Sequence, residues 1–222
     1  MQPYQRRFIE LALARSALRF GQFTLKSGRV SPYFFNAGLF SDGASIAALG
    51  RCYAEALLHA GLEFDMLFGP AYKGIPLVTA TAIALAEHCG RNVPWAFDRK
   101  EAKDHGEAGA LVGAPLAGRV VICDDVISDG AAKRAAIERI RAAGAEPVGV
   151  VLALDRQERG ASDRSAVQEM ESQYRLRCIS ILTLAELIAA LSAAPSGSPT
   201  AIQPGQLAAL EAYRLRYGVN AA

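Results

Sequence analysis

The 222-residue sequence has few cysteines and histidines, and these are scattered. Its four cysteines form no CxxC pair and its three histidines are dispersed, which argues against a zinc site. We expect the cysteines to be free thiols in a reducing cytoplasm. No apolar run reaches the roughly 18 residues of a membrane span. The polar segment 1–7 also lacks the apolar core of a signal peptide.

A strong charge of either sign is also missing, because the formal net charge is only +2. Nucleic-acid-binding domains usually concentrate many basic residues on one face, so we expect no nucleic-acid partner. A small anionic ligand needs only a few well-placed Lys and Arg side chains. The length and the 51% hydrophobic content suit one ordinary globular α/β domain.

Apolar stretches typical of strands alternate with helical stretches over most of the chain. We expect strands at 65–69, 93–97, 119–123, 148–154 and 176–181, and helices at 75–89, 131–143 and 184–191. This alternation predicts an α/β fold with a mostly parallel central sheet flanked by helices. Ligands bind at the carboxyl ends of such strands, so functional residues should follow Phe68, Phe97, Cys123 and Leu154.

The remaining segments predict elements outside this alternation. Before it we expect a helix at 4–20, a hairpin at 22–37 and a helix capped by Asp42. Residues 100–113 predict a mobile loop, residues 195–205 a linker and residues 207–217 a final helix. We therefore divide the chain into an N-terminal helix and hairpin (1–40), a core (41–194), and a linker with a C-terminal helix (195–222).

One stretch joins an apolar strand, two adjacent carboxylates and the start of a helix. Residues 120–132 read Val-Val-Ile-Cys-Asp-Asp-Val-Ile-Ser-Asp-Gly-Ala-Ala. Asp124 and Asp125 are adjacent carboxylates that repel each other. A site that binds a cation or the hydroxyls of a ligand explains such a pair better than core packing does. The free N–H groups and dipole of a helix N-terminus favour a phosphate, so the stretch suits a ribose 5-phosphate. Acids that merely cap the helix are the simpler alternative.

A charged stretch follows the strand expected at 93–97. Residues 99–107 read Arg-Lys-Glu-Ala-Lys-Asp-His-Gly-Glu. A solvated loop is the ordinary interpretation of such a run. The stretch also suits a lid that closes over a pyrophosphate leaving group and excludes water. The cationic side chains of such a lid would be Arg99, Lys100, Lys103 and His105.

Three further features suit anionic ligands. Residues 68–76 (Phe-Gly-Pro-Ala-Tyr-Lys-Gly-Ile-Pro) form a tight turn that opens a helix, although an ordinary loop fits them too. Phe34 and Phe35 are adjacent on a strand, so they face opposite sides. One of them, near Lys26, suits a planar anionic base, whereas core packing is the commoner role of such aromatics. Arg156 ends a buried strand, where it can bind a carboxylate bidentately.

Together these motifs resemble those of type I phosphoribosyltransferases, and the charged loop and the aromatic hairpin resemble those of orotate phosphoribosyltransferases. The resemblance covers roughly residues 4–190. It implies that the hairpin is a hood over the active site, and that the chain transfers phosphoribose from phosphoribosyl pyrophosphate (PRPP) to orotate in pyrimidine (UMP) biosynthesis. It also implies Mg²⁺ held mainly through PRPP and water, with no direct protein ligand. A homodimer is implied in which the 99–109 loop reaches the neighbouring active site.

The resemblance also implies roles for individual residues. The catalytic residues would be Lys103, His105, Asp124 and Asp125. Orotate would contact Lys26, Phe34, Phe35, Ser128 and Arg156. PRPP would contact Lys26, Tyr72, Lys73, Arg99, Lys100, Lys103, His105, Asp124, Asp125, Val126, Ile127, Ser128, Asp129, Gly130, Ala131 and Ala132.

The chain departs from the family pattern in the PRPP motif. Thr-Ala-Gly-Thr is common where this chain has Ser128-Asp129-Gly130-Ala131. Ala131 lacks a hydroxyl, and Asp129 adds a carboxylate beside the expected phosphate. That carboxylate repels the phosphate unless it points away or is offset by Lys133. We expect Asp129 to face solvent or cap the helix, and PRPP binding to be somewhat weakened.

Two alternatives remain open. One is a phosphoribosyltransferase for another base, against which the combination of Lys26, Phe34, Phe35 and Arg156 argues. The other is a PRPP-sensing regulator on the same fold that binds nucleic acid. Such a regulator should have a basic surface and could dispense with the lid, whereas this chain is nearly neutral and keeps it.

Overall fold

The computed structural model describes residues 1–25, 27–103, 109–127, 130–160, 162–195 and 197–219. Within this part, the side chains of residues 100–103 and 109–110 are not described. No helix in the described ranges is long and apolar enough to cross a membrane.

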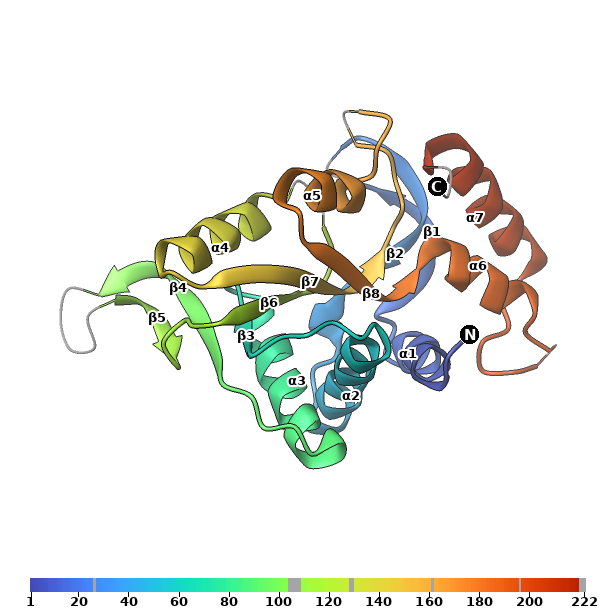
Figure 1. Ribbon diagram of the computed structural model, residues 1–222. Helices are drawn as coiled ribbons and strands as arrows, with labels where there is room; N and C mark the ends of the chain where they lie inside the picture. Colours follow the sequence, from blue (N-terminus) through green and yellow to red (C-terminus); the bar gives the residue numbers. More distant parts are fainter. Residues whose placement is uncertain (26, 104–108, 128–129, 161, 196, 220–222) are drawn as a thin grey trace.

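A six-stranded sheet with the order β5-β4-β3-β6-β7-β8 forms the centre of the described structure (Figure 1). Its strands are β3 (Met66–Gly69), β4 (Trp95–Lys103), β5 (Gly109–Gly113), β6 (Arg119–Asp124), β7 (Glu146–Asp155) and β8 (Arg177–Thr183). Neighbouring strands are parallel except for β4 and β5. The predicted mostly parallel sheet is therefore confirmed, with one antiparallel strand at its edge.

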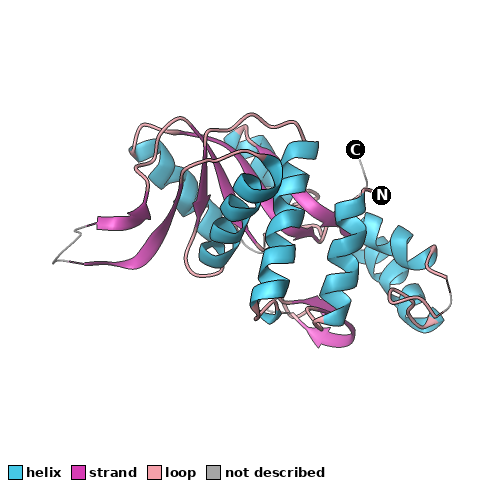
Figure 2. Ribbon diagram, turned by 90° about the horizontal axis from the view of Figure 1, so that it is seen from below, coloured by secondary structure: helices cyan, strands magenta, loops and turns pink. Residues whose placement is uncertain are grey.

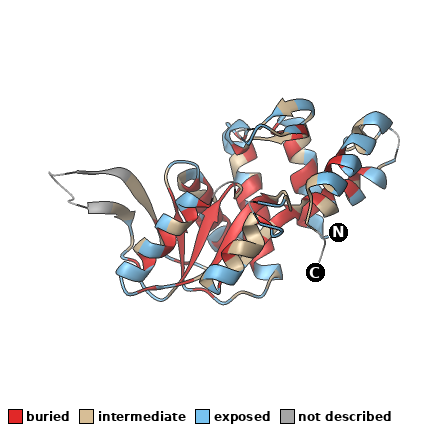
Figure 3. Ribbon diagram, turned by 90° about the horizontal axis from the view of Figure 1, so that it is seen from above, coloured by how far each residue is buried: buried red, intermediate tan, exposed pale blue. Residues whose placement is uncertain are grey.

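Helices cover both faces of this sheet. The helices α2 (Gly43–His59) and α3 (Gly74–Cys89) pack on one face, and α4 (Ala131–Ala142) and α5 (Ala166–Tyr174) pack on the other (Figure 1). Along β6, Val121 and Cys123 join the core on the α2/α3 side, whereas Val120 and Ile122 join the core on the α4/α5 side. Successive strand residues face opposite sides, so a sheet covered twice needs apolar residues throughout. The central strands are accordingly buried (Figure 3).

The hood is a separate two-stranded sheet of β1 (Leu18–Thr24) and β2 (Val30–Phe35), followed by a short 3₁₀ helix, η1 (Ala37–Leu39). It packs against α1 (Pro3–Ala14) and the C-terminal helix α7 (Pro204–Tyr217). The predicted hairpin is confirmed, but the helix expected at 4–20 is too long. It ends at Ala14 because Ser16 takes a left-handed conformation and Leu18 pairs with Phe35. Strand pairing here overrides the helical spacing of the apolar residues.

The segment 100–113 is a second correction. It does not form a loop throughout, because β4 continues to Lys103 and β5 pairs with it, matching Phe97 with Val112. The two strands form a hairpin that projects beyond the helical layers (Figure 2). Backbone hydrogen bonds between strands need no apolar side chains, so a charged sequence can adopt this structure. Residues 104–108 lie outside the described part.

The other predicted elements are confirmed within a few residues of their ends. Asp42 caps α2 and accepts a hydrogen bond from the Ser45 amide, as the sequence indicates. The last expected strand–helix pair is β8 and α6 (Leu184–Ser192), and the expected final helix is α7. The helix α5 was not expected, although Ser165 and Gln168 form a capping box at its start.

Candidate active site

The sheet has a topological switch point between β3 and β6. From β3 the chain moves outward to β4, and it later returns to the other side of β3 to form β6. Loops that leave two such strands diverge and open a crevice at their carboxyl ends. The turn that carries Tyr72 and Lys73 leaves β3, and the acidic pair ends β6. Both motifs therefore meet at this crevice, as their positions after strand ends predict.

The turn between β3 and α3 lies close against the end of β6. A Cβ atom on Gly74 would lie 2.9 Å from the carbonyl oxygen of Cys123, so only glycine fits there. The Ala71 amide donates to Asp98 Oδ1 at 2.6 Å, and the Ala71–Tyr72 peptide bond is cis. Lys73 reaches across the crevice, where its Nζ lies 2.5 Å from Asp125 Oδ2. The Tyr72 side chain is exposed.

The two carboxylates at the end of β6 are buried and paired with lysines. Asp124 Oδ2 forms an ion pair with Lys133, whose Nζ also donates to the Val126 carbonyl at 2.6 Å. Burial raises the pKa of Asp124, and the Lys133 ammonium opposes that shift. Asp124 Oδ1 and Asp125 Oδ1 accept hydrogen bonds from the amides of Asp125 and Val126.

This geometry contradicts the helix-capping alternative for the acidic pair. Within the described part, neither carboxylate accepts from an amide of the first turn of α4, whose N-cap residue is Gly130.

The loop between β6 and α4 is anchored at both ends. Val126 packs against the core on the α2/α3 side, and Ile127 against the core on the α4/α5 side. Gly130 adopts φ 71°, and a Cβ atom there would lie 3.0 Å from Arg134 Nη1. The helix then begins at Ala131 and Ala132, so its N-terminal amides border the loop. Ser128 and Asp129 lie outside the described residues.

The adjacent hood phenylalanines face opposite sides, as predicted. Phe35 points into the core, with ring centroids 5.9 Å from Phe8 and 6.3 Å from Phe40. Phe34 stacks on Phe23 at 5.5 Å on the other side. Lys26 lies outside the described part.

Arg156 lies one residue beyond the end of β7 and beneath the hood. Its guanidinium carbon lies 4.5 Å from the centre of the Tyr33 ring. Its Nη2 is 2.6 Å from Glu158 Oε1 and 3.3 Å from Ser31 Oγ. Neither Glu158 nor Tyr33 stood out in the sequence. Glu158 is only two residues from Arg156, but Tyr33 belongs to a distant segment that the fold brings onto the guanidinium.

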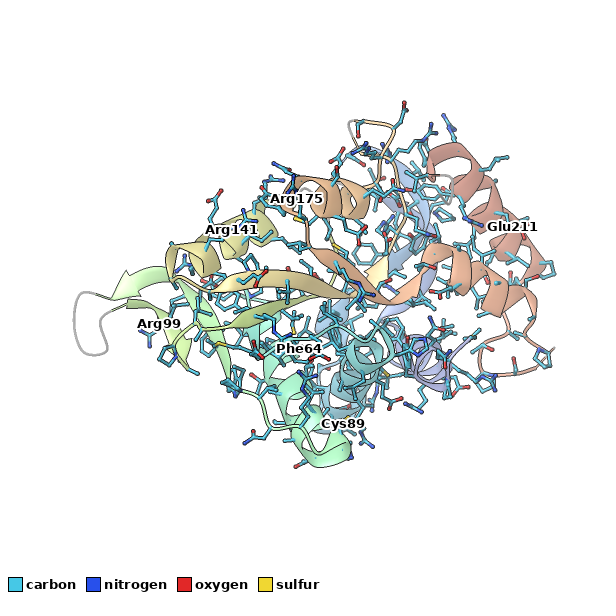
Figure 4. All side chains as sticks on the ribbon, viewed as in Figure 1. Phe64, Cys89, Arg99, Arg141, Arg175 and Glu211 are labelled. Atoms are coloured by element: carbon cyan, nitrogen blue, oxygen red, sulfur yellow. The ribbon has the colours of Figure 1, made fainter. Side chains whose placement is uncertain are left out.

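The cations of the charged stretch lie on the projecting hairpin. Figure 4 places Arg99 there, at the opposite end of the sheet from the hood. Lys100 and Lys103 belong to β4, but their side chains are not described, and His105 lies outside the described part. Within one described chain, Arg99 is thus separated from the Arg156 subsite.

Comparison with known proteins identifies the family. The profile of the phosphoribosyl transferase domain matches residues 39–178. The orotate phosphoribosyltransferase of Thioalkalivibrio sulfidiphilus is 60% identical over 99% of this chain and 100% of its own length. The chain belongs to the orotate phosphoribosyltransferase family.

Solved structures of this family have the same fold. The orotate phosphoribosyltransferase of Francisella tularensis superposes with a TM-score of 0.84 at 38% identity, covering 95% of this chain and 98% of that one. A Mycobacterium tuberculosis orotate phosphoribosyltransferase in complex with PRPP has a TM-score of 0.61 at 25% identity, covering 83% and 98%. The type I phosphoribosyltransferase fold expected from the sequence is thus confirmed.

Proposed function

We propose that this chain transfers the 5-phosphoribosyl group of PRPP to orotate, giving orotidine 5′-monophosphate and pyrophosphate in de novo pyrimidine biosynthesis. The order of the strands supports this proposal most directly. Along the sheet edge, β4 leads to the basic hairpin, β3 to Lys73, β6 to the acidic pair and β7 to Arg156. Pyrophosphate, ribose and base follow one another in the same order in the reacting pair of molecules.

PRPP binding is assigned to the crevice at the switch point. Asp124 and Asp125 accept hydrogen bonds from the ribose hydroxyls, and the 5-phosphate lies at the loop of residues 126–132, where α4 begins. Tyr72 and Lys73 contact the pyrophosphate from the turn after β3. The side chains of Lys26 and Ser128 complete this site in the proposal.

Orotate binding is assigned to the space between the hood and the end of β7. The carboxylate of orotate pairs with the Arg156 guanidinium, which is suited to bidentate recognition. Phe34 lies on the hood face away from the core, and the Phe35 ring points into the core. Phe34 therefore supplies the aromatic surface in our proposal, and Phe35 contributes through its backbone and by anchoring the strand.

Catalysis requires little covalent chemistry from the protein. A ring nitrogen of orotate loses its proton to water or to the departing pyrophosphate and forms a bond to the anomeric carbon. The bond from that carbon to the pyrophosphate oxygen breaks, with inversion. Lys103 and His105 neutralise the charge that develops on pyrophosphate, and a closed lid excludes water. The distance of the basic hairpin from the Arg156 subsite supports a homodimer in which residues 99–109 act on the neighbouring site.

Mg²⁺ fits this site as an ion held by the substrate. Asp124 and Asp125 each direct one carboxylate oxygen at a lysine and the other at a backbone amide. Direct coordination of a metal by these oxygens would disrupt those contacts. Mg²⁺ typically keeps several waters and binds substrate phosphates, and it would neutralise the pyrophosphate here.

We assign the enzyme to the cytoplasm.

A spectrophotometric assay of orotate consumption tests the proposal. The purified chain is mixed with orotate, PRPP and Mg²⁺, and uracil, adenine and hypoxanthine replace orotate in parallel reactions. We expect orotate loss that requires PRPP and is far faster than conversion of the other bases. Preference for another base would instead support the salvage alternative. No turnover of any base would support the regulator.

A further inference from the structure

The C-terminal helix α7 contacts the residues that surround Arg156. It packs against the hood strand β2 and against α6 (Figure 1). Tyr213, in its last turns, is buried, and its ring meets the Tyr33 ring edge-on with centroids 6.2 Å apart. Tyr33 in turn lies against the Arg156 guanidinium. One helix thus supports the hood residue on which Arg156 rests.

The same tyrosine also holds the carboxylate that orients Arg156. The Tyr213 hydroxyl donates to Glu158 Oε1 at 3.0 Å. Burial and the nearby Glu158 carboxylate raise the pKa of Tyr213, which keeps its hydroxyl protonated as a donor. Arg29 of the hood lies 3.7 Å from the other oxygen of Glu158, Oε2. Glu158 is therefore fixed from two directions, by α7 and by the hood.

Backbone pairing fixes the segment that carries Glu158. The Arg159 amide donates to the Tyr217 carbonyl at 2.8 Å, and the Val219 amide donates to the Gln157 carbonyl at 2.9 Å. These bonds join the end of α7 to the loop that follows β7. The Glu158 side chain, only 15% exposed, has little freedom to leave Arg156.

Glu158 occupies the Nε/Nη2 edge of the guanidinium, and Nη2 also donates to Ser31 Oγ at 3.3 Å. Both Nε and Nη2 of Arg156 contact Glu158 Oε1, at 2.8 and 2.6 Å. Among the residues that the structure describes, Nη1 donates no hydrogen bond to the protein. The Nη1/Nη2 edge is therefore the one suited to a ligand carboxylate. Rotation of the guanidinium would misalign that edge.

We infer that Tyr213 is a positioning residue for orotate binding, which acts through Glu158 and Tyr33 to hold the Arg156 guanidinium in its ligand-binding orientation. This inference rests on the proposed role of Arg156 in binding the orotate carboxylate. It makes α7 a part of the base subsite, although the helix is about 50 residues from Arg156 in the sequence.

Steady-state kinetics of Tyr213→Phe test this inference, because the change removes only the hydroxyl. We expect the KM for orotate to rise about three- to tenfold, as for the loss of one hydrogen bond, while kcat and the KM for PRPP stay within about twofold. Tyr217→Phe is the matched control. It makes the same change in the same helix, and the described structure has no hydrogen-bond partner for its hydroxyl. The control should leave all three constants within about twofold.

Arg156→Gln separates the inference from the proposed function. If Arg156→Gln raises the KM for orotate and Tyr213→Phe does not, the positioning role is wrong and the Arg156 assignment stands. If Arg156→Gln leaves that KM unchanged, both are wrong. In the Arg156→Gln background, Tyr213→Phe should have no further effect on the KM for orotate. An equal effect in both backgrounds would show that Tyr213 does not act through Arg156, and would overturn the inference.

Discussion

Lys73 and Asp125 form an ion pair across the crevice between β3 and β6, with Nζ and Oδ2 2.5 Å apart. The two residues belong to motifs more than 50 positions apart, and each was expected to contact PRPP. Asp125 is buried, whereas the Lys73 side chain is 55% exposed. Lys73 can therefore move to an incoming pyrophosphate, while Asp125 stays in place for the ribose.

Lys73→Gln should weaken PRPP binding selectively. The substitution removes one charge-assisted contact worth roughly 1.5 kcal/mol, so we expect the KM for PRPP to rise about tenfold. The KM for orotate should change less than about twofold, because Lys73 lies on the pyrophosphate side of the site. Initial-rate kinetics with each substrate varied measure both effects, and Lys73→Arg serves as the control that keeps the charge. An unchanged KM for PRPP would show that Lys73 only balances Asp125.

Lys133→Met should destabilise the fold in a pH-dependent way. The change leaves the buried Asp124 carboxylate without its partner, which typically costs about 3 kcal/mol. Because burial already raises the pKa of Asp124, the folded state holds its proton more readily than the unfolded state. Stability contributed by this group is therefore lost as the pH rises above the ordinary aspartate value. Removing Lys133 extends this loss to higher pH.

Urea unfolding at pH 5 and pH 7.5 measures this effect. The deficit of Lys133→Met relative to the wild type should be larger at pH 7.5. The double variant Asp124→Asn/Lys133→Met, which has no carboxylate to compensate, should recover much of the stability. A deficit that is the same at both pH values would contradict the explanation and point to lost packing of the lysine chain.

The two hood phenylalanines should differ in what their loss affects. Phe35 packs in the core with Phe8 and Phe40, so Phe35→Ala should lower the free energy of unfolding by about 3 kcal/mol. Phe34 lies outside that core, so Phe34→Ala should cost less than about 1 kcal/mol and mainly raise the KM for orotate. Urea unfolding and orotate kinetics on the pair would distinguish the roles, and the reverse pattern would refute them.

Asp129→Ala should strengthen PRPP binding. A carboxylate beside the expected 5-phosphate repels it, so we expect the KM for PRPP to fall about two- to fivefold. Glu138→Ala removes an equal charge from an exposed position of α4 and should have little effect. If the KM for PRPP is unchanged or higher in Asp129→Ala, the repulsion is absent.

Lys103→Ala should lower kcat by orders of magnitude and leave the fold intact, since a lid cation acts mainly on the transition state.

Mixing the Lys103→Ala variant with the Arg156→Gln variant tests whether the lid acts on the neighbouring subunit. In a symmetric dimer, hybrids of the two variants contain one site with both residues, so an equal mixture should regain roughly a quarter of wild-type activity. Mixtures no more active than the separate variants would show that each lid serves its own site.

The local sequence predicted most of the elements and the composition of the site. Apolar runs such as 119–123 were sufficient to identify buried strands, because a strand covered on both faces needs apolar residues throughout. Asp42 similarly marked a helix start through local chemistry. The helix expected at 4–20 and the loop expected at 100–113 were wrong where hairpin pairing with the next strand decided the backbone.

The sequence by itself determined that the chain has an orotate phosphoribosyltransferase's motifs, and it predicted a ribose-phosphate site after β6, because each motif lies within one short segment. Only the tertiary structure decided how charges are matched within the site. Lys73 pairs with Asp125, Lys133 with Asp124, and Glu158 with both Arg156 and Tyr213. Except for Arg156 and Glu158, which share one loop, these contacts join residues on different elements, and each includes a carboxylate with little exposure to solvent. Which charged groups are buried together depends on the packed fold, so no local pattern could reveal these pairs.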